Sequence, residues 1–159
     1  MGKIGLTRRG LLSLAPAALV APTCAAPAGD PVPALYAADR LSGLALRGFD
    51  AVTYALASGP AAGRPGLELT WSGLIWRFAG PANRAAFARD PARYAPRLGG
   101  YDPEGIAAGR VVDADPLVAA WRDGLLYLFR SPERRERADA ALLAAAEARW
   151  PALRAEVAL

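Results

Sequence analysis

Two stretches of the chain alternate apolar and polar residues on either side of a pair of turn-forming residues. The first, "LELTWSGLIWRFA" at 67–79, turns at Ser72-Gly73, and the second, "LVAAWRDGLLYLF" at 117–129, turns at Asp123-Gly124. A two-residue turn containing glycine between alternating segments predicts a β-hairpin, because glycine readily adopts the required backbone angles. We therefore expect two antiparallel hairpins, the first with these residues on its core face: Trp71, Phe78 and either Ile75 or Trp76.

Proline marks the helices that follow each hairpin. Gly80-Pro81 predicts a helix to about Arg89, since proline at the first helical position loses no hydrogen bond, and Asp90-Pro91 ends that helix and begins a short helical turn. Ser131-Pro132 predicts the longest helix, which runs to about Trp150, where Pro151 should end or kink it. Its apolar residues form one stripe at helical spacing: Leu142, Ala146, Trp150 and Leu153.

The remaining elements are short. Residues 44–57 predict a short strand, a turn at Gly48 and a helical turn with Asp50 as its N-cap, and residues 104–109 predict another short helix. No internal repeat beyond the two hairpins is apparent. The pattern as a whole predicts an α+β domain. It would contain a small antiparallel sheet from the two hairpins, short connecting helices, and a C-terminal helix packed on the sheet.

Residues 1–28 have the layout of a bacterial export signal. Basic residues come first, an apolar run from Leu11 to Ala21 follows, and small residues offer cleavage after Ala25 or Ala28. The apolar run is shorter than the roughly 20 residues that cross a bilayer, so we expect no stable membrane anchor after cleavage. Residues 29–43, which contain Pro31 and Pro33, then read as a linker, with the domain at 44–159.

The basic stretch "TRRGLL" resembles the twin-arginine signal, with Arg8 and Arg9 as the paired arginines. This resemblance implies export by the twin-arginine pathway and a periplasmic location. Two alternatives remain open. The arginines would serve equally as the basic start of a general export signal, and a lipoprotein anchor at Cys24 is conceivable, although the four residues before it are unlike a lipobox.

Charge and residue inventory exclude several classes of function. Of 19 basic residues, three lie in the export segment, which leaves 16 against 15 acidic ones and a net charge of about +1, so no nucleic-acid partner is expected. Histidine is absent, and the only cysteine is Cys24. A processed chain therefore has no sulfur or imidazole ligand for zinc, copper or iron–sulfur clusters, and no cysteine nucleophile. We expect no metal site, no cofactor and no catalytic residues.

Four segments together resemble the YHS domain, in the form found in exported bacterial proteins. They are "LRGFDAVTYA" at 46–55, the stretch from Trp71 to Gly105, "DPLVAAWRDGLLYLF" at 115–129, and "WP" at 150–151. Relatives attached to metal transporters are similar to small metal-binding modules with cysteine ligands, and exported relatives often carry one more cysteine. Here those positions hold other residues: Thr53, Ala79, Asn83 and Asp102. The resemblance thus implies the scaffold without the metal chemistry.

The best candidate site lies in the loops, above all in "GGYDPEG" at 99–105. Its glycines allow close backbone approach to a ligand, and the segment offers a phenol and carboxylates. The candidate ligand-binding residues are Asp50, Tyr94, Gly99, Gly100, Tyr101 and Asp102. The ordinary alternative is a helix start, with Asp102 as N-cap. The helix start at Gly80-Pro81 could also receive an anion near Asn83 and Arg84, although a capping role for Asn83 is the simpler interpretation.

These observations predict an exported protein that binds a small ligand or a periplasmic protein partner and is not an enzyme. The alternative is a carboxylate-based enzyme, or an enzyme subunit that is exported with a cofactor already bound. A purely structural module is a third possibility.

Overall fold

The computed structural model describes residues 1–2 and 36–157. The expected export signal, including Arg8, Arg9 and both cleavage positions, lies outside the described residues. The chain divides after Asp30 into two units, and every helix and strand of the described residues belongs to the second, Pro31–Leu159. No helix in the described part is long and apolar enough to cross a membrane.

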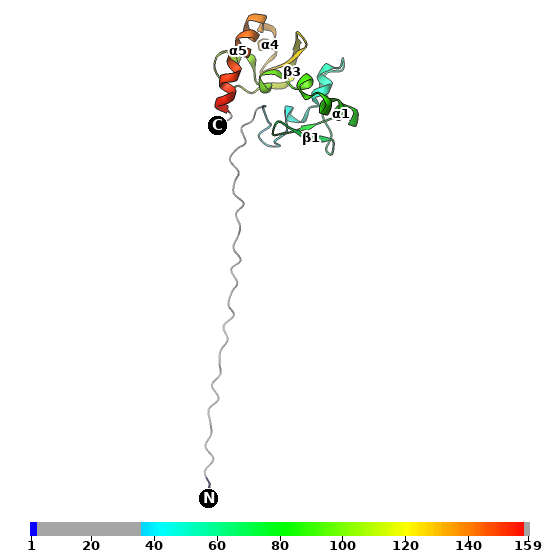
Figure 1. Ribbon diagram of the computed structural model, residues 1–159, viewed down its shortest axis with the longest axis vertical. Coiled ribbons are helices and arrows are strands. Elements are labelled where there is room, and N and C mark those ends of the chain that lie inside the picture. Colours follow the sequence, from blue (N-terminus) through cyan, green and yellow to red (C-terminus); the bar gives the residue numbers. More distant parts are fainter. Residues whose placement is uncertain (3–35, 158–159) are drawn as a thin grey trace. The chain divides into compact units, whose positions relative to one another are not determined.

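The α+β fold expected from the sequence is confirmed. Strands β1 (Glu68–Trp71) and β2 (Leu74–Arg77) pair antiparallel, and so do β3 (Asp115–Arg122) and β4 (Leu125–Phe129). Both hairpins turn at the expected residues, where Ser72 and Asp123 adopt positive φ before their glycines. Each hairpin forms a two-stranded sheet of its own. Figure 1 shows β1 with α1 in one part of this unit and β3 with α4 and α5 in another.

Short helices fill the connections, and each begins with a residue suited to that position. Pro81, Pro91, Pro103 and Pro132 each occupy a first-turn position of their helix, where their missing N–H costs no hydrogen bond. The α-helices are α1 (Pro81–Arg89), α2 (Pro91–Tyr94), α3 (Pro103–Ala107), α4 (Pro132–Arg137) and α5 (Ala140–Val157). The described residues also form the 3₁₀-helices η1 (Leu46–Gly48), η2 (Ala51–Ala55) and η3 (Arg97–Gly100).

The C-terminal helix differs from the expectation in two ways. The chain leaves helical geometry at Ala138, and a new helix begins after Asp139, whose Oδ1 accepts a hydrogen bond from the Leu142 N–H at 2.8 Å. Pro151 lies inside α5 and does not end it. Leu153, beyond the proline, is buried against the second hairpin's core, and this packing favours continuation of the helix.

The two hairpins belong to a longer internal repeat, contrary to the expectation from the sequence. "LRGFD" at 46–50 and "LGGYD" at 98–102 each begin with three successive residues of positive φ. After each, the backbone pairs in the same way, because the N–H of Asp50 donates to Ala61 O and that of Asp102 donates to Val112 O, both at 2.9 Å. A hairpin follows in both cases. We call residues 46–89 the first half and residues 98–137 the second half.

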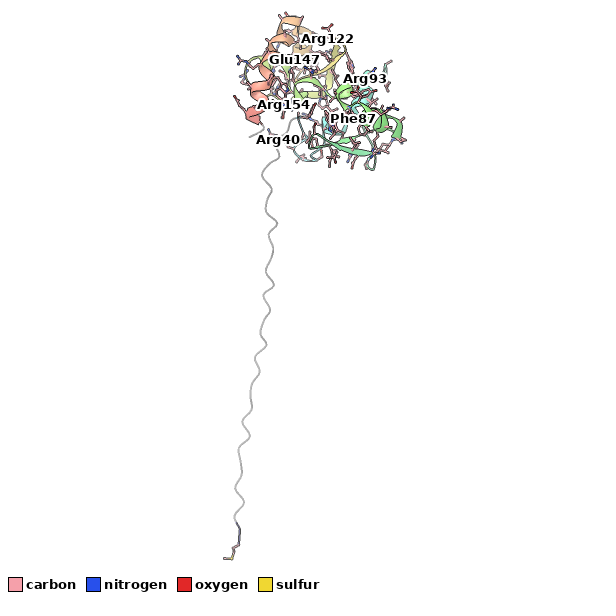
Figure 2. All side chains as sticks on the ribbon, viewed as in Figure 1. Arg40, Phe87, Arg93, Arg122, Glu147 and Arg154 are labelled. Carbon is pink, nitrogen blue, oxygen red and sulfur yellow. The ribbon has the colours of Figure 1, made fainter. Side chains whose placement is uncertain are left out.

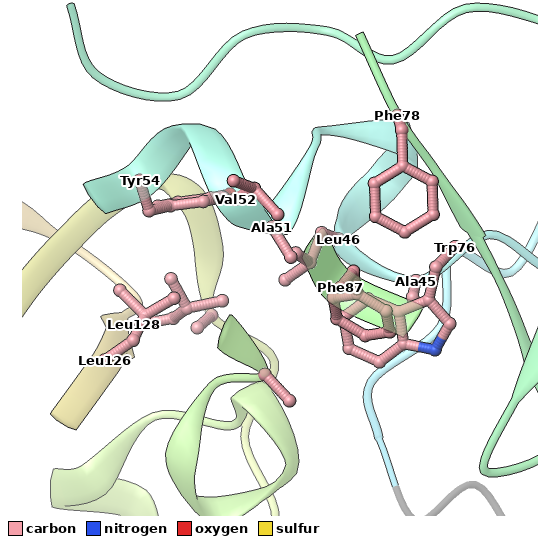
Figure 3. Close-up of a cluster of buried hydrophobic side chains, with 12 residues drawn as sticks. Ala45, Leu46, Ala51, Val52, Tyr54, Trp76, Phe78, Phe87, Leu126 and Leu128 are labelled. Carbon is pink, nitrogen blue, oxygen red and sulfur yellow. The ribbon is translucent and has the colours of Figure 1, made fainter. Parts of the chain in front are cut away.

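The ends of the halves also correspond. "FAGP" at 78–81 leads from the first hairpin into α1, and "FRSP" at 129–132 leads from the second into α4. The domain has two cores, and the first also receives Leu126 and Leu128 from β4 of the second half. Trp76, Phe78 and Phe87 gather in the first (Figure 3), with ring centroids of Trp76 and Phe87 4.9 Å apart. The second core joins β3 and β4 to α3 and α5, which confirms that the C-terminal helix packs on a sheet.

Candidate functional site

Asp50 has no exposed surface and is fully hydrogen-bonded. Its Oδ1 accepts a bond from the Val52 N–H at 2.9 Å, which is the expected N-cap. Its Oδ2 accepts bonds from the Ala79 N–H at 2.8 Å and from Asn83 Nδ2 at 2.6 Å. The carboxylate of Asp50 therefore occupies the start of α1, where an external anion had been one expectation, and Asn83 donates to this carboxylate.

Asp102 is held in the corresponding way in the second half. It is also completely buried, and its Oδ1 accepts a bond from the Arg130 N–H at 2.9 Å. Its Oδ2 accepts bonds from the Gly105 N–H at 2.9 Å and from Arg134 Nη1 at 2.6 Å. Arg134 also lies 3.5 Å from Glu104, through its Nε. Each buried aspartate thus ties a left-handed turn to the helix that follows the hairpin of the same half.

A cavity of about 410 Å³ lies where these two left-handed turns approach each other. Leu46 and Arg47 line it from the first half, and Gly99 and Gly100 line it from the second. Its inner surface is apolar and formed mainly by buried side chains: Ala45, Leu46, Trp76, Ala114, Pro116 and Leu128. A cavity of this size and polarity has the character of a small-molecule site.

Residues 36–41, which precede the first half, form another wall of the cavity. Tyr36 packs against Trp71 and Trp76, with ring centroids 5.2 and 5.4 Å apart. The Ala37 N–H donates to Gly99 O at 2.7 Å, which joins this segment to the turn of the second half. The described part of the predicted linker is therefore packed against the domain.

Four charged side chains line the cavity beside its apolar surface. They are Asp39, Arg40, Arg47 and Asp113, and Arg40 is labelled in Figure 2. None of them forms an ion pair within 4.0 Å among the described residues. They are nevertheless close enough to affect nearby pKa values. Burial raises the pKa of Tyr101, Asp113 raises it further, and Arg40 lowers it.

Asp39 differs from the other three because its own turn engages it. Its Oδ1 accepts bonds from the Ser42 hydroxyl and the Ser42 N–H, both at 2.8 Å, and from the Leu41 N–H at 3.2 Å. These bonds, the Ser42 hydroxyl first, lower the pKa of Asp39, and Arg47 adds a smaller effect in the same direction. Asp39 consequently fixes the loop that carries Arg40 and Leu41 at the cavity.

Backbone strain coincides with this cavity. Leu46 and Arg47 lie at φ values of 54° and 51°, in the left-handed region that costs non-glycine residues about 1–2 kcal/mol each. Leu98 has the same conformation, at φ 55°. Such strain is concentrated at functional sites in folded proteins, where the surrounding structure maintains it.

The structure brings together only some of the residues that the sequence suggested. Gly99 and Gly100 line the cavity, whereas Asp50, Tyr101 and Asp102 are buried and do not belong to its lining. Tyr94 is half-buried against the first core and is not among the lining residues, and the Arg93 guanidinium lies 5.8 Å from its ring centroid. In the described residues no group of three or more acidic, histidine or cysteine side chains is placed to hold a metal ion.

Sequence reasoning missed the charged residues of the cavity, Asp39, Arg40, Arg47 and Asp113. One signal could have located part of the site, namely the recurrence of Leu-x-Gly-(Phe/Tyr)-Asp at 46–50 and 98–102. Comparison with known proteins found no matching family model, no matching curated protein and no matching solved structure.

Proposed function

We propose that this chain is an exported, non-enzymatic protein whose YHS-like domain binds a small molecule in the cavity between the two left-handed turns. The observation that carries the proposal is the cavity itself. It joins an apolar surface that includes Trp76 and Leu128 to four charged side chains without ion-pair partners among the described residues. An apolar pocket with a few convergent polar groups is the usual form of a ligand site.

The non-enzymatic part of the proposal is supported by how the carboxylates are used. General acid–base catalysis needs a carboxylate within hydrogen-bond reach of the substrate. Asp50 and Asp102 have no exposed surface, and each accepts three hydrogen bonds from the protein. Asp39 is engaged by its own turn. These three carboxylates serve the fold, which leaves Asp113 as a single free carboxylate in the described cavity lining, rather than a pair that could act as acid and base.

Export is supported by the first 28 residues, with Arg8 and Arg9 as a twin-arginine pair and cleavage after Ala25 or Ala28. We place the processed protein in the periplasm. The twin-arginine pathway transports proteins that are already folded, so this domain would fold before its export.

The test is to purify the processed protein from its native compartment, identify co-purifying small molecules by native mass spectrometry, and screen a fragment library by thermal shift. Ala38→Leu places a larger side chain on the cavity wall, and Ala88→Leu makes the same change on the exposed surface of α1. We expect retained molecules and ligand-induced melting shifts in the wild-type protein and in Ala88→Leu, and their loss in Ala38→Leu. Shifts that are equal in both variants, or absent from the wild-type protein, would refute a ligand role for the cavity.

A further inference from the structure

The chemistry of the cavity limits the class of molecule that it can accept. Its volume of about 410 Å³ lies within the range of roughly 300–1,000 Å³ that is usual for ligand pockets, so it suits one small organic molecule. Tyr36, Ala38 and Leu41 offer that molecule an apolar surface, because they keep exposed area, whereas Trp76 and Leu128 are only 1% and 2% exposed. The ligand therefore needs an apolar part as well as groups that can meet the charged lining.

The cavity lining carries charges of both signs. Asp39 and Arg47 are near enough to interact, since Arg47 contributes to the lowered pKa of Asp39. Arg40 and Asp113 both act on Tyr101, in opposite directions. A ligand with only a negative charge would meet Asp113, and a ligand with only a positive charge would meet Arg40 and Arg47. Repulsion between like charges therefore disfavours a ligand that carries charge of one sign only.

The two aspartates are not equivalent as partners for a ligand. Asp39 Oδ1 already accepts three hydrogen bonds from Leu41 and Ser42. Asp113 is exposed, and its side chain forms no ion pair within 4.0 Å with any other described residue. Asp113 is consequently the carboxylate available to a cationic group, and Arg40 and Arg47 are the cations available to an anionic one.

We infer that the cavity recognises a zwitterionic small molecule with an apolar body, such as an aromatic amino acid. Arg47, with Arg40, binds its carboxylate, Asp113 binds its ammonium group, and the apolar surface formed by Tyr36, Ala38 and Leu41 receives the side chain. This inference rests on the proposed function, because it names the class of ligand for the same cavity. Guanidinium groups suit the carboxylate because they donate two parallel hydrogen bonds to it.

Three compounds with the same indole ring test the inference by isothermal titration at low ionic strength. L-Tryptophan carries both charges, tryptamine only the ammonium group, and indole-3-propionate only the carboxylate. We expect the dissociation constant of L-tryptophan to be about tenfold or more below those of the other two, as matched charges on both sides require. Raising the salt concentration should reduce this difference, because the charged side chains are exposed.

Two substitutions should alter the preference in opposite ways. Arg47→Gln should remove the advantage of L-tryptophan over tryptamine, and Asp113→Asn should remove its advantage over indole-3-propionate. Arg89→Gln and Asp123→Asn make the same chemical changes at exposed positions outside the cavity lining, and both should leave all three affinities unchanged.

A failure of the zwitterion inference can be told apart from a failure of the proposed function. Equal affinities for the three compounds, or no binding of L-tryptophan to the wild-type protein, would overturn the zwitterion inference. The fragment screen with Ala38→Leu and Ala88→Leu would still decide whether the cavity binds ligands at all. If Ala38→Leu leaves the screen unchanged, both proposals fail together.

Discussion

The first and second halves hold a buried aspartate in the same place by different chemistry. In the first half all three donors to Asp50 are neutral, namely two backbone N–H groups and the Asn83 amide. In the second half two backbone N–H groups are joined by the charged guanidinium of Arg134. The same backbone arrangement thus holds a buried carboxylate either with neutral donors alone or with an ion pair. We call each aspartate with its three donors a clasp, neutral in the first half and charged in the second.

The difference follows from where each donor lies. Arg134 is half-buried on α4, where its Nε can also reach Glu104, and Arg137 donates to Glu104 at 2.9 Å. The second clasp therefore extends into a charge network near the surface. The side chain of Asn83 is short and bonds only to Asp50, so the first clasp does not extend into a surface charge network. Removing the aspartate should destabilise the fold more where it leaves a charged donor unpaired than where it leaves only neutral donors unpaired.

The largest expected effect separates the two clasps directly. Asp102→Ala should lower the free energy of unfolding by about 3–5 kcal/mol, because it leaves a partly buried guanidinium and two N–H groups without their acceptor. Asp50→Ala should cost less, about 2–4 kcal/mol, because only neutral donors lose their acceptor. Urea unfolding followed by tryptophan fluorescence measures both, since Trp71 and Trp76 report on the first core and Trp150 packs near the second.

Arg134→Asn is the matched control for this comparison. It keeps Asp102 and supplies an amide at the position that corresponds to Asn83, whose Nδ2 lies 2.6 Å from its aspartate. We expect Arg134→Asn to lower the free energy of unfolding much less than Asp102→Ala does. A loss as large as that of Asp102→Ala would show that the second half cannot use a neutral clasp.

The hairpins were predictable because their information is local. Ser72-Gly73 and Asp123-Gly124 provide the positive φ values that a two-residue turn needs, and each turn sets the pairing of the residues beside it. The break before α5 was not predictable in this way. Ala138 favours helix by propensity, and only its burial in the second core together with the cap at Asp139 explains why the helix stops and restarts.

The candidate site was predicted only where glycine marked it. Gly99 and Gly100 drew attention because glycine is the usual residue at positive φ. Arg47 occupies the same conformation in the first half without any such signal, because residue preference places arginine elsewhere. Asp39 and Arg40 lie in a segment whose composition resembles a linker. Their role depends on long-range packing of Tyr36 and Ala37, which no local pattern contains.

A second contrast between the halves should appear at high pH. Trp76 Nε1 donates to Trp71 O at 3.0 Å, whereas the corresponding Tyr127 hydroxyl donates to Glu147 Oε1 at 2.8 Å. Burial, with the Glu147 carboxylate, raises the pKa of Tyr127 to about 12. A tyrosine with a raised pKa contributes stability that is complete below its unfolded pKa of roughly 10 and is lost as the pH rises towards 12.

Tyr127→Phe should therefore cost about 1–2 kcal/mol at pH 7, where it removes a hydrogen bond to a charged acceptor. The difference from the wild-type protein should shrink between about pH 10 and pH 12, because only the wild-type protein loses the Tyr127 contribution there. Unfolding free energies measured across this range provide the test. Parallel curves for the two proteins would mean that Tyr127 titrates alike in the folded and unfolded chains.

The smallest expected effect concerns the one position where the two left-handed turns differ in strain. Arg47 in the first half corresponds to Gly99 in the second, and both have positive φ. Arg47→Gly relieves about 1–2 kcal/mol of left-handed strain and loses roughly 0.5–1 kcal/mol to the greater freedom of unfolded glycine. The variant should therefore be more stable than the wild-type protein by at most about 1.5 kcal/mol, as measured by urea unfolding.

The same substitution should weaken the binding of L-tryptophan, since it removes the guanidinium that we assign to the ligand carboxylate. The gain in stability follows from the backbone conformation alone, so the loss of affinity is the result that assigns Arg47 to the ligand. Gly99→Ala in the second half is the reverse change, and it should destabilise the protein because alanine resists the left-handed conformation. If Arg47→Gly were destabilising and left L-tryptophan binding unchanged, the arginine would belong to the scaffold, and the two turns would differ without functional consequence.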